Sequence, residues 1–562
     1  MKKKCSILLV CAGGNSTSIL VQSMRKDLRE DENWYIDAEG VSQVRDLIGK
    51  YDYILVAPQM KFALQDIRVL AEPFGDIQVL EIPADIYASC SGSAVNDMVR
   101  RLQDPGSKDN ERGKTMSENT SKSNKIMDKI SDWMNEKLVL VANKISNQRH
   151  LAAVRDGLTI MIPATIIGGF AILLAVPPIP AGVTEPTNIL YAFLLAWQSW
   201  AGAHFGALIT PYYLTIGIIS IYAVCGVSYQ LAKRYNMNGL NNMISALLVF
   251  LIISGGLDFS NGMIDSSRFG AGYMFAAMIT GILVVEITRA FDTHNIKIKL
   301  PDTVPPNVAA PFNVLIALAF NVIVFTLVNS LLIKLTGGGI PDLVYTLIAP
   351  LMKATGSLPS ILFLTFLSSL FWFFGIHGDN MMSAVTTPIT TMALAANAEA
   401  VAAGQPLPYI YAGMMAAVFG GWIVGNNAMN LDLLIFGKSG RVKSLSRVAA
   451  IPAMFNIAEP YVFGLPEVLN MYYFIPAVIC QILNLTSYYV LASMNLVGRF
   501  YISLPFTTPA PLNALLGTGG DIRCFLFSIV CILVNMVIFY PFLKAYDNSL
   551  LKEEEENAAK AE

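Results

Sequence analysis

The sequence predicts a protein of two parts, an N-terminal α/β domain with a doubly wound parallel sheet of about four strands and a polytopic α-helical membrane domain. The first observation is that short apolar runs alternate with amphipathic stretches up to about residue 104, whereas long apolar runs recur from about residue 158 onward. The second is composition, since 54% of the 562 residues are hydrophobic and 14% are charged, against roughly 25% charged in soluble domains.

The N-terminal domain is expected to span residues 1–104. Its buried strands are expected at the apolar runs 7–10, 53–56 and 77–80. Residues 19–28 place apolar side chains at helical spacing, and strands that alternate with helices favour parallel βαβ units. This alternation predicts the doubly wound sheet.

A polar segment, residues 105–127, follows this domain and contains almost no side chain that a core could bury. We interpret it as a flexible linker. The membrane domain is then expected over residues 128–548. The last residues, 549–562, form an acidic tail that we interpret as a solvated end without chemistry.

The apolar runs of the membrane domain predict about ten crossings, and the shorter runs indicate re-entrant or broken helices. Basic residues cluster at 233–234, 289–299 and 438–447, whereas the loop 177–188 has no Lys or Arg. By the positive-inside rule the basic connections are cytoplasmic. The sequence therefore predicts a multi-pass membrane protein with a cytoplasmic N-terminal domain.

Charge and cysteine usage exclude several classes of protein. The formal net charge is −2, so no basic excess indicates a nucleic-acid partner. The seven cysteines are scattered without CxxC spacing, which argues against a disulfide framework or a zinc site. We expect neither a metal nor a cofactor in this chain.

One of the cysteines, Cys11, directly follows the first predicted strand and precedes a helical pattern. In doubly wound sheets, ligands bind at the carboxyl ends of strands. Glycines after Cys11 let backbone N–H groups point inward, and hydroxyls can cap the helix, so the turn is predicted to bind phosphate and to favour a nucleophilic thiolate. The expected phosphate-binding residues are Ala12, Gly13, Gly14, Asn15, Ser16, Thr17 and Ser18. The alternative is a buried structural thiol in a turn that merely needs glycine.

A cysteine phosphatase is a rival interpretation of the same turn. Its loop has an Arg six positions after the nucleophile to bind the phosphate oxygens, and here Thr17 stands at that position. A phosphocysteine would therefore form without efficient hydrolysis, which is the property of a phosphate carrier.

Two apolar stretches of the membrane domain contain polar side chains, of which charged ones cost about 2.5 to 3.5 kcal/mol each in lipid. Glycines flank the histidine in the first stretch, residues 371–380, and prolines interrupt the second, residues 455–466. Transporters use such broken helices as substrate sites. The expected substrate-binding residues are His377, Asp379, Asn380, Asn456 and Glu459, with Trp372, Phe373 or Tyr461 as candidates for stacking on a sugar face.

Structural alternatives exist for several of these residues. His377 could be a histidine whose hydrogen bonds are made at a helix end. Glu459 could be an interfacial or salt-bridged carboxylate. Glu286 and Arg289 are three residues apart and are interpreted as an interfacial ion pair. The other histidines, His150, His204 and His294, lie near segment ends and are given no chemical role.

The strand, the CAGGNSTS turn at residues 11–18 and the later Ala57-Pro-Gln-Met resemble the IIB domain of the lactose/cellobiose family of phosphotransferase sugar permeases. The GIHG, N-x-x-E-P and P-x-x-V-P-P elements of the membrane half resemble the IIC domain of the same family. One departure is Ala458, where the family often has Asn before the Glu.

The resemblance implies a homodimeric carrier in a bacterial cell membrane that imports a sugar and releases it phosphorylated. It implies that Cys11 carries the phosphoryl group, that Glu459 contacts the reacting sugar hydroxyl as the base, and that His377 orients the sugar. A separate phosphorylated IIA protein, supplied by HPr and enzyme I, would be the donor. The sugar would be a β-linked disaccharide such as cellobiose, chitobiose or lactose.

The hypothesis is therefore a phosphoenolpyruvate-dependent sugar permease, an enzyme of the protein-phosphocysteine–sugar phosphotransferase class. A hypothesis from another class is an ion-coupled secondary sugar transporter whose N-terminal domain is a regulatory anion-binding module. A third is a cysteine phosphatase anchored to the membrane. They are distinguished by whether uptake needs Cys11 or an ion gradient, and by whether free phosphate is released.

Overall fold

The computed structural model describes the residues 3–11, 15–29, 32–40, 44–57, 64–75, 77–83, 86–87, 92–103, 148–177, 179, 183–258, 262–298, 306–374, 377–420, 422–457, 461 and 470–561. Several expectations fall on residues outside these ranges. They concern the turn residues Ala12 to Gly14, the linker 105–127, the catalytic candidate Glu459 and its neighbour Ala458.

The N-terminal domain contains a four-stranded sheet in the order β2-β1-β3-β4, with every neighbouring pair parallel. The predicted doubly wound sheet of about four strands is thus confirmed. Its elements are β1 (Lys3–Cys11), α1 (Asn15–Lys26), β2 (Glu32–Gly40), α2 (Val44–Leu47), η2 (Ile48–Lys50), β3 (Tyr53–Val56), α3 (Leu64–Ala71), η4 (Glu72–Phe74), β4 (Gln78–Glu81) and α5 (Gly92–Gln103).

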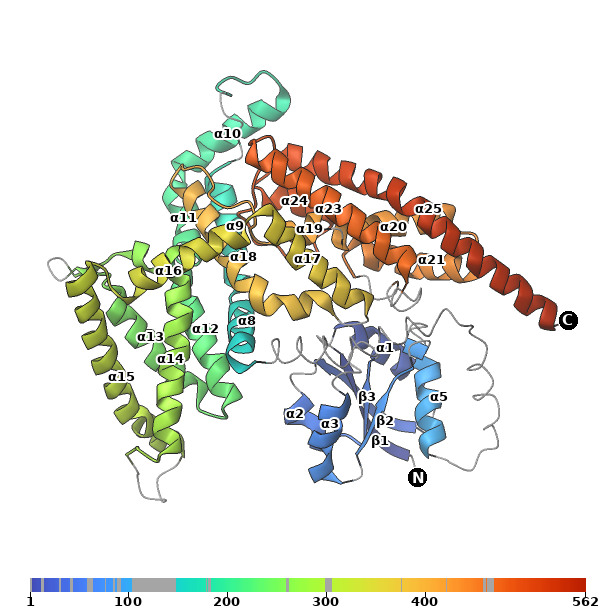
Figure 1. Cartoon of the computed structure of the whole chain (residues 1–562), viewed down its shortest axis with the longest axis horizontal. Coiled ribbons are helices and arrows are strands. Elements are labelled where there is room, and N and C mark those ends of the chain that lie inside the picture. Colours follow the sequence, from blue (N-terminus) through green and yellow to red (C-terminus); the bar gives the residue numbers. More distant parts are fainter. Residues whose placement is uncertain are drawn as a thin grey trace.

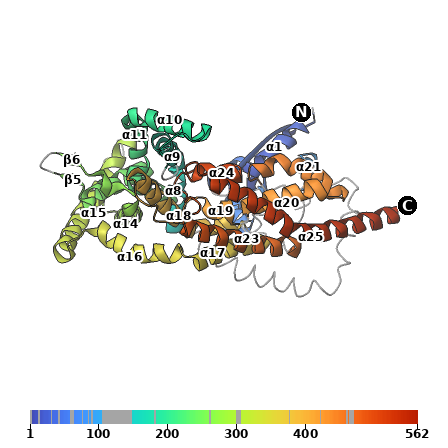
Figure 2. The same cartoon turned by 90° about the horizontal axis from the view of Figure 1, so that it is seen from above.

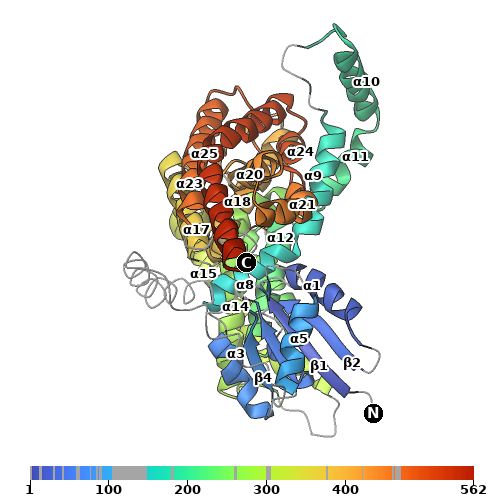
Figure 3. The same ribbon diagram turned by 90° about the vertical axis from the view of Figure 1, so that its right-hand side faces the viewer.

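Both faces of this sheet are covered, because successive side chains of a strand point to opposite faces. Ile7 and Leu9 of β1 pack in a core with α1 and α5, whereas Leu8 and Val10 pack in a second core with α2, η2 and α3. All four side chains are fully buried. The helices on the two sides of the strands are seen in Figure 3. The continuous apolar run of β1 therefore follows from burial on both faces.

The sequence pattern did not identify β2 as a strand. Trp34 and Ile36 of β2 are buried, but the strand lies at an edge and its other residues are mostly polar. An edge strand covered on one face alternates apolar and polar residues, so it lacks the continuous run that marked the central strands.

Arg100 of α5 joins the start of β2 to the end of α1. Its guanidinium donates to both carboxylate oxygens of Glu32, at 2.7 and 2.9 Å, and to the backbone oxygen of Asp27 at 3.1 Å. It also lies over the Trp34 ring at 5.8 Å from the centroid. The hydrogen bond from Arg100 holds the pKa of Glu32 below its ordinary value of 4.5, against the opposing effect of burial.

The remainder of the described chain is almost entirely helical (Figure 1). Its elements are α8 (Arg149–Ile160), α9 (Ile162–Ala175), α10 (Ile189–Ala203), α11 (Phe205–Tyr213), η6 (Ile216–Ile218), α12 (Ile219–Arg234), α13 (Gly239–Ser254), β5 (Leu257–Asp258), β6 (Met263–Ile264), η7 (Ser266–Phe269), η8 (Ala271–Tyr273), α14 (Met274–Thr293), α15 (Pro306–Thr336), α16 (Ile340–Thr355), α17 (Leu358–Phe373), α18 (Gly378–Ala402), α19 (Met415–Phe419), α20 (Trp422–Phe436), α21 (Gly440–Met454), α23 (Met471–Ser493), α24 (Ala510–Gly517) and α25 (Ile522–Ala561).

Within the described ranges, five helices are long and apolar enough to cross a membrane, or up to seven if each bent pair counts as one span. The bent pairs are α8 with α9, at 45°, and α16 with α17, at 74°. Broken helices were expected and are present. Other apolar runs lie in shorter helices, such as α13 with 16 residues. The expected number of about ten crossings stays a prediction, because the search covers only the described ranges.

Two groups of helices form the membrane half. In Figure 1, α12, α13, α14 and α15 form one group, and α20, α23 and α25 form another. The long helix α18 contacts α8, η8 and α17. Helix α10 projects from the body, as Figures 1 and 3 both show. The start of α18 lies against α17, where the Ser368 hydroxyl donates to Asp379.

The expected Glu286–Arg289 pair is present, with Arg289 Nη1 donating to Glu286 Oε2 at 3.2 Å. The same carboxylate also contacts His150 Nε2 at 2.8 Å and accepts from the Tyr235 hydroxyl at 2.5 Å. This network joins the start of α8 and the end of α12 to the C-terminal half of α14.

The acidic end of the chain continues helix α25 through Ala561, and Figure 2 shows this end extending away from the other helices. Glu554 accepts from the backbone N–H groups of Gly440 and Arg441, both at 3.1 Å. Asp547 accepts from Lys438 N and Ser439 N at 2.8 and 3.0 Å. The acidic end therefore caps the N-terminus of α21, a contact that the interpretation as a purely solvated end missed.

Candidate functional site: a strand-end cysteine and a polar cavity

Cys11 is the last residue of β1, and α1 begins at Asn15. The strand order 2-1-3-4 changes direction between β1 and β3, and Ala57 after β3 donates its N–H to the Val10 carbonyl at 2.9 Å. Ligands of open α/β sheets bind at this switch point, outside the carboxyl ends of the strands. The structure thus places the backbone of Cys11 and the start of α1 at the position that the sequence predicted.

A polar cavity of about 430 Å³ lies between α17, α18, the segment before α19, and α23. His377, Asp379 and Asn456 line it, so three of the five expected substrate residues are brought together. A volume of this size is within the range of small-molecule sites, about 300 to 1,000 Å³. Glu459 lies outside the described residues.

His377 stands before the first turn of α18 and caps that helix. Its Nδ1 accepts the Asn380 N–H at 3.2 Å, which in a neutral imidazole leaves the proton on Nε2. The Trp372 ring lies against the imidazole, with ring centroids 4.3 Å apart. His377 is therefore a helix cap and a cavity residue at once, with Nε2 available as a donor.

Asp379 ties the start of α18 to α17. Its Oδ1 accepts from the Ser368 hydroxyl at 2.7 Å and its Oδ2 accepts from Trp372 Nε1 at 3.3 Å. A Cβ on Gly378 would lie 2.0 Å from the Ser368 carbonyl oxygen, so only glycine allows this approach. These contacts hold Trp372 and His377 in position at the cavity wall.

Asn456 has a positive φ of 64° at the end of α21. Asn tolerates this left-handed conformation. Its Nδ2 donates to the carbonyls of Phe506 and Thr508 at 2.6 and 2.8 Å. The side chain therefore fixes the chain as it leaves α21, immediately before the segment that contains Glu459.

Comparison with known proteins identifies both halves. Residues 155–480 match the family model "Phosphotransferase system, EIIC", and residues 6–95 match "PTS system, Lactose/Cellobiose specific IIB subunit". The first match covers more than half of the chain. This chain belongs to the EIIC family of the phosphotransferase system.

The relatives of this EIIC chain carry names with different sugars. It is 31% identical to the oligo-beta-mannoside-specific EIIC component of Bacillus subtilis (strain 168), over 77% of this chain and 97% of that one. It is 29% identical to the lactose-specific EIICB component of Streptococcus mutans, over 75% and 73% respectively. The solved structure of the transporter ChbC, the IIC component of the N,N'-diacetylchitobiose-specific system, matches with a TM-score of 0.68 and 29% identity, over 75% of this chain and 99% of that chain.

EIIC proteins are integral membrane transporters, and the IIB domain is part of the cytoplasmic component of the system. Membership therefore establishes a multi-pass membrane protein of a sugar phosphotransferase system, with a sugar substrate and phosphoryl relay partners.

Three expected residues of the EIIC part do not line the polar cavity. The side chain of Asn380 is exposed and does not line the cavity. Tyr461 is fully buried and donates its hydroxyl to Asn430 Oδ1, so this ring is held in the core rather than presented to a sugar. Phe373 faces a separate side pocket. Of the three aromatic candidates, Trp372 lines the main cavity.

Sequence reasoning missed the hydroxyl groups of the cavity. On α18 they come from Ser383, Thr386, Thr387 and Thr390, at helical spacing. Three of these, Ser383, Thr386 and Thr390, donate their own protons to backbone carbonyls one turn earlier, which leaves their oxygens as acceptors. The signal was a stripe of hydroxyls repeating every three to four residues in an apolar helix.

Proposed function

We propose that this protein imports a β-linked disaccharide, such as cellobiose, chitobiose or lactose, and phosphorylates it from phospho-Cys11 during transport. The observation that carries the proposal is the presence, in one chain, of a IIB-type cysteine at the switch point of a parallel sheet and a polar cavity in an EIIC part. The names of the relatives support a β-linked sugar.

The cavity has the chemistry that a sugar needs. Hydroxyl groups of a sugar are bound by groups that donate and accept, and the threonine oxygens with His377 Nε2 supply both. An apolar ring face packs on an aromatic plane, and the Trp372 indole is fixed by its hydrogen bond to Asp379. We propose that Trp372 and His377 orient the sugar in this cavity.

The chemical step is an in-line transfer of the phosphoryl group. A sugar hydroxyl, at C6 by family analogy, attacks the phosphorus of phospho-Cys11. The new O–P bond forms as the S–P bond breaks, the thiolate leaves with the electron pair, and Glu459 accepts the hydroxyl proton. The thiolate is a suitable leaving group if backbone N–H groups of residues 12–18 stabilise it, as the sequence predicts.

The remaining assignments rest on the family. The donor to Cys11 is a separate IIA protein that receives its phosphate through HPr and enzyme I, and the carrier acts as a homodimer. The charged product cannot diffuse back through the membrane. Transport is then driven by phosphoenolpyruvate rather than by an ion gradient.

The test uses labelled phosphoenolpyruvate, the general phosphotransferase proteins and membranes that contain the full chain, with a panel of β-linked disaccharides. Cys11→Ser should abolish both the acid-stable label on the protein and the phosphorylated sugar. Cys5→Ala, which removes a buried sulfur from the same strand, should retain both. Normal formation of sugar phosphate by Cys11→Ser would refute the proposal. Uptake that persists in this variant and follows an ion gradient would identify a secondary transporter instead.

A further inference from the structure

The C-terminal end of α25 supplies two carboxylates to the start of α21. Asp547 is 4% exposed and accepts the N–H of Ser439, and Glu554 accepts the N–H groups of the next two residues. The Ser439 hydroxyl accepts the N–H of Val442 at 3.3 Å. The four N–H groups that a helix start leaves without helical partners are thus all bonded. Three of these bonds come from carboxylates that lie 108 to 114 residues later in the chain.

The same face of α25 also packs against α21. Asp547 and Glu554 are seven residues apart, so they lie on one face of the helix about two turns from each other. Apolar side chains on this face share a buried cluster with α21. The members from the two helices are Leu543, Tyr546, Leu550, Val442, Ala449 and Ala453. The end of α25 therefore holds α21 by hydrogen bonds at its start and by apolar packing along its length.

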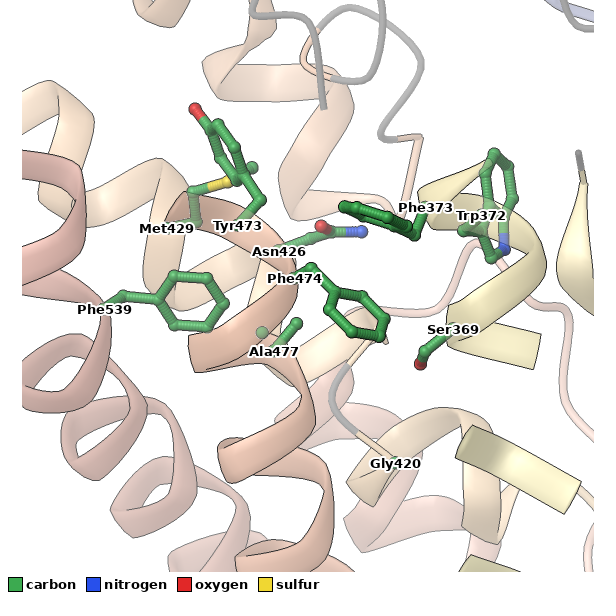
Figure 4. Close-up of a pocket in the computed structure, with 11 residues that line it drawn as sticks. Ser369, Trp372, Phe373, Gly420, Asn426, Met429, Tyr473, Phe474, Ala477 and Phe539 are labelled. Carbon is green, nitrogen blue, oxygen red and sulfur yellow. The ribbon is translucent and has the colours of Figure 1, made fainter. Parts of the chain in front are cut away.

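The helix held in this way leads directly to the polar cavity. Asn456, just after the end of α21, lines that cavity. The chain returns to the same region at the start of α23, where Tyr473 lines the small pocket that Phe373 faces (Figure 4). This pocket shares Trp372 and Asn426 with the polar cavity. The connection between α21 and α23 therefore begins and ends beside the cavity.

The end of α25 holds the start of α23 as well. The centroid of the Tyr546 ring lies 5.7 Å from that of Tyr472 and 5.8 Å from that of Tyr473. In the sequence, Glu459 lies between α21 and α23. Both helices that flank the proposed base are thus held by one element.

The residues proposed to orient the sugar are positioned by other contacts. Trp372 lies on α17 and His377 at the start of α18, and Asp379 ties these two helices together. The structure therefore separates the elements that hold these sugar-orienting residues from the helices that flank Glu459.

We propose that Asp547 and Glu554 are positioning residues for phosphoryl transfer. By fixing α21 they place the chain after Asn456, and with it Glu459, against the sugar hydroxyl that attacks phospho-Cys11. Neither carboxylate lines the polar cavity. Both act at a distance, because a displacement of about 1 Å at a reacting group lowers a rate by about 100-fold. This inference rests on the proposed function, since it concerns the proton acceptor of that reaction.

The test measures phosphoenolpyruvate-dependent sugar phosphorylation and equilibrium sugar binding in membranes that contain the full chain. We expect Asp547→Ala to lower kcat about tenfold or more, with sugar affinity and the label on Cys11 within about twofold of the unmodified protein, because the groups that orient the sugar stay in place. Asp547→Asn keeps one acceptor oxygen and should lose less. Glu554→Ala, at an exposed position, should lower kcat in the same direction by a smaller factor. Glu555→Ala is the matched control, since it removes the same charge from the adjacent exposed residue.

A second measurement tests whether the effect passes through Glu459. In a Glu459→Gln background the proton acceptor is already lost, so Asp547→Ala should lower the residual rate by less than about twofold. If Asp547→Ala does not reach the membrane, Asp547→Asn and Glu554→Ala carry the same comparison.

Three results would overturn the proposal. They are an undiminished effect of Asp547→Ala in the Glu459→Gln background, a parallel loss of sugar affinity and kcat, and an unchanged kcat in both Asp547→Ala and Glu554→Ala. Failure of the proposed function is distinguishable from all three, because the unmodified protein would then phosphorylate no sugar and Cys11 would carry no label.

Discussion

At the scale of single residues, His377 combines two tasks that the sequence presented as alternatives. Its Nδ1 caps α18, and this bond fixes the tautomer in which Nε2 can donate. The ring is further held against Trp372, whose indole is bonded to Asp379. Capping thus orients the imidazole toward the cavity instead of competing with a role in binding.

The two tasks can be separated by substitution. Asn is a good helix cap, so His377→Asn should keep the start of α18 while it removes the Nε2 donor. We expect the apparent KM for sugar to rise about five- to tenfold, since a lost hydrogen bond costs about 1 to 1.5 kcal/mol. The measurement is sugar phosphorylation against sugar concentration.

His377→Ala is the matched comparison, because it removes the cap as well. It should lower the thermal stability in detergent by about 1 kcal/mol relative to His377→Asn, in addition to the rise in KM. A His377→Asn protein with the KM of the unmodified protein would show that His377 only caps the helix.

Cys11 and His377 could be proposed from the sequence because each is a rare residue type in an unusual local context. Cys11 begins a glycine-rich turn, and His377 lies within an apolar membrane stretch. The threonine oxygens of α18 and the Asn426 amide could not be located in this way. Threonine and asparagine are unremarkable in membrane helices, where their hydroxyls often bond their own backbone. Only the packing of four helices shows which of them face one cavity.

At the scale of elements, features that depend on local sequence could also be predicted, whereas features that depend on packing could not. The central strands β1 and β3 were evident from continuous apolar runs, whereas the edge strand β2 was not. Gly378, one of the glycines that flank His377 in the sequence, lets α18 approach the backbone of α17. The glycine was noticed, and the contact that requires it depends on a neighbour that local sequence does not specify.

The contacts of Arg100 make the stability of the N-terminal domain dependent on pH. The pKa of Glu32 is lowered on folding, so its contribution is fully present above the ordinary carboxyl value of 4.5 and is lost as pH falls through the lower folded value. Arg100→Met should remove most of this pH dependence and destabilise the domain at neutral pH. The measurement is hydrogen exchange of β1 and β2 in the full chain, expressed as opening free energies.

Arg68→Met provides the control, because the Arg68 guanidinium donates to the backbone carbonyl of Val79 rather than to a carboxylate. Its opening free energies should keep the slope of the unmodified protein in the acid range. An Arg100→Met protein with that same slope would contradict the assignment to the Glu32–Arg100 pair.

At the scale of the whole molecule, the chain combines parts that have separate cores. The N-terminal sheet buries its apolar residues between its own helices, and the membrane half has clusters of its own. Neither the cysteine nor the cavity can complete the proposed reaction alone. The proposed reaction therefore depends on how often the two parts meet, and we propose that the predicted linker, residues 105–127, sets this frequency.

Cutting the linker tests this dependence. A flexible linker of about 20 residues has a root-mean-square reach of about 25 Å and keeps the donor domain at an effective concentration near millimolar. After cleavage at a protease site inserted within residues 105–127, transfer from Cys11 to sugar becomes bimolecular. At micromolar protein the rate should fall about 100-fold or more and should recover as free N-terminal domain is added. The uncleaved protein with the same insertion is the control, and labelling of Cys11 should be equal in both. A rate that is unaffected by cleavage and dilution would mean that the two parts bind each other tightly, so that the linker contributes nothing to the transfer.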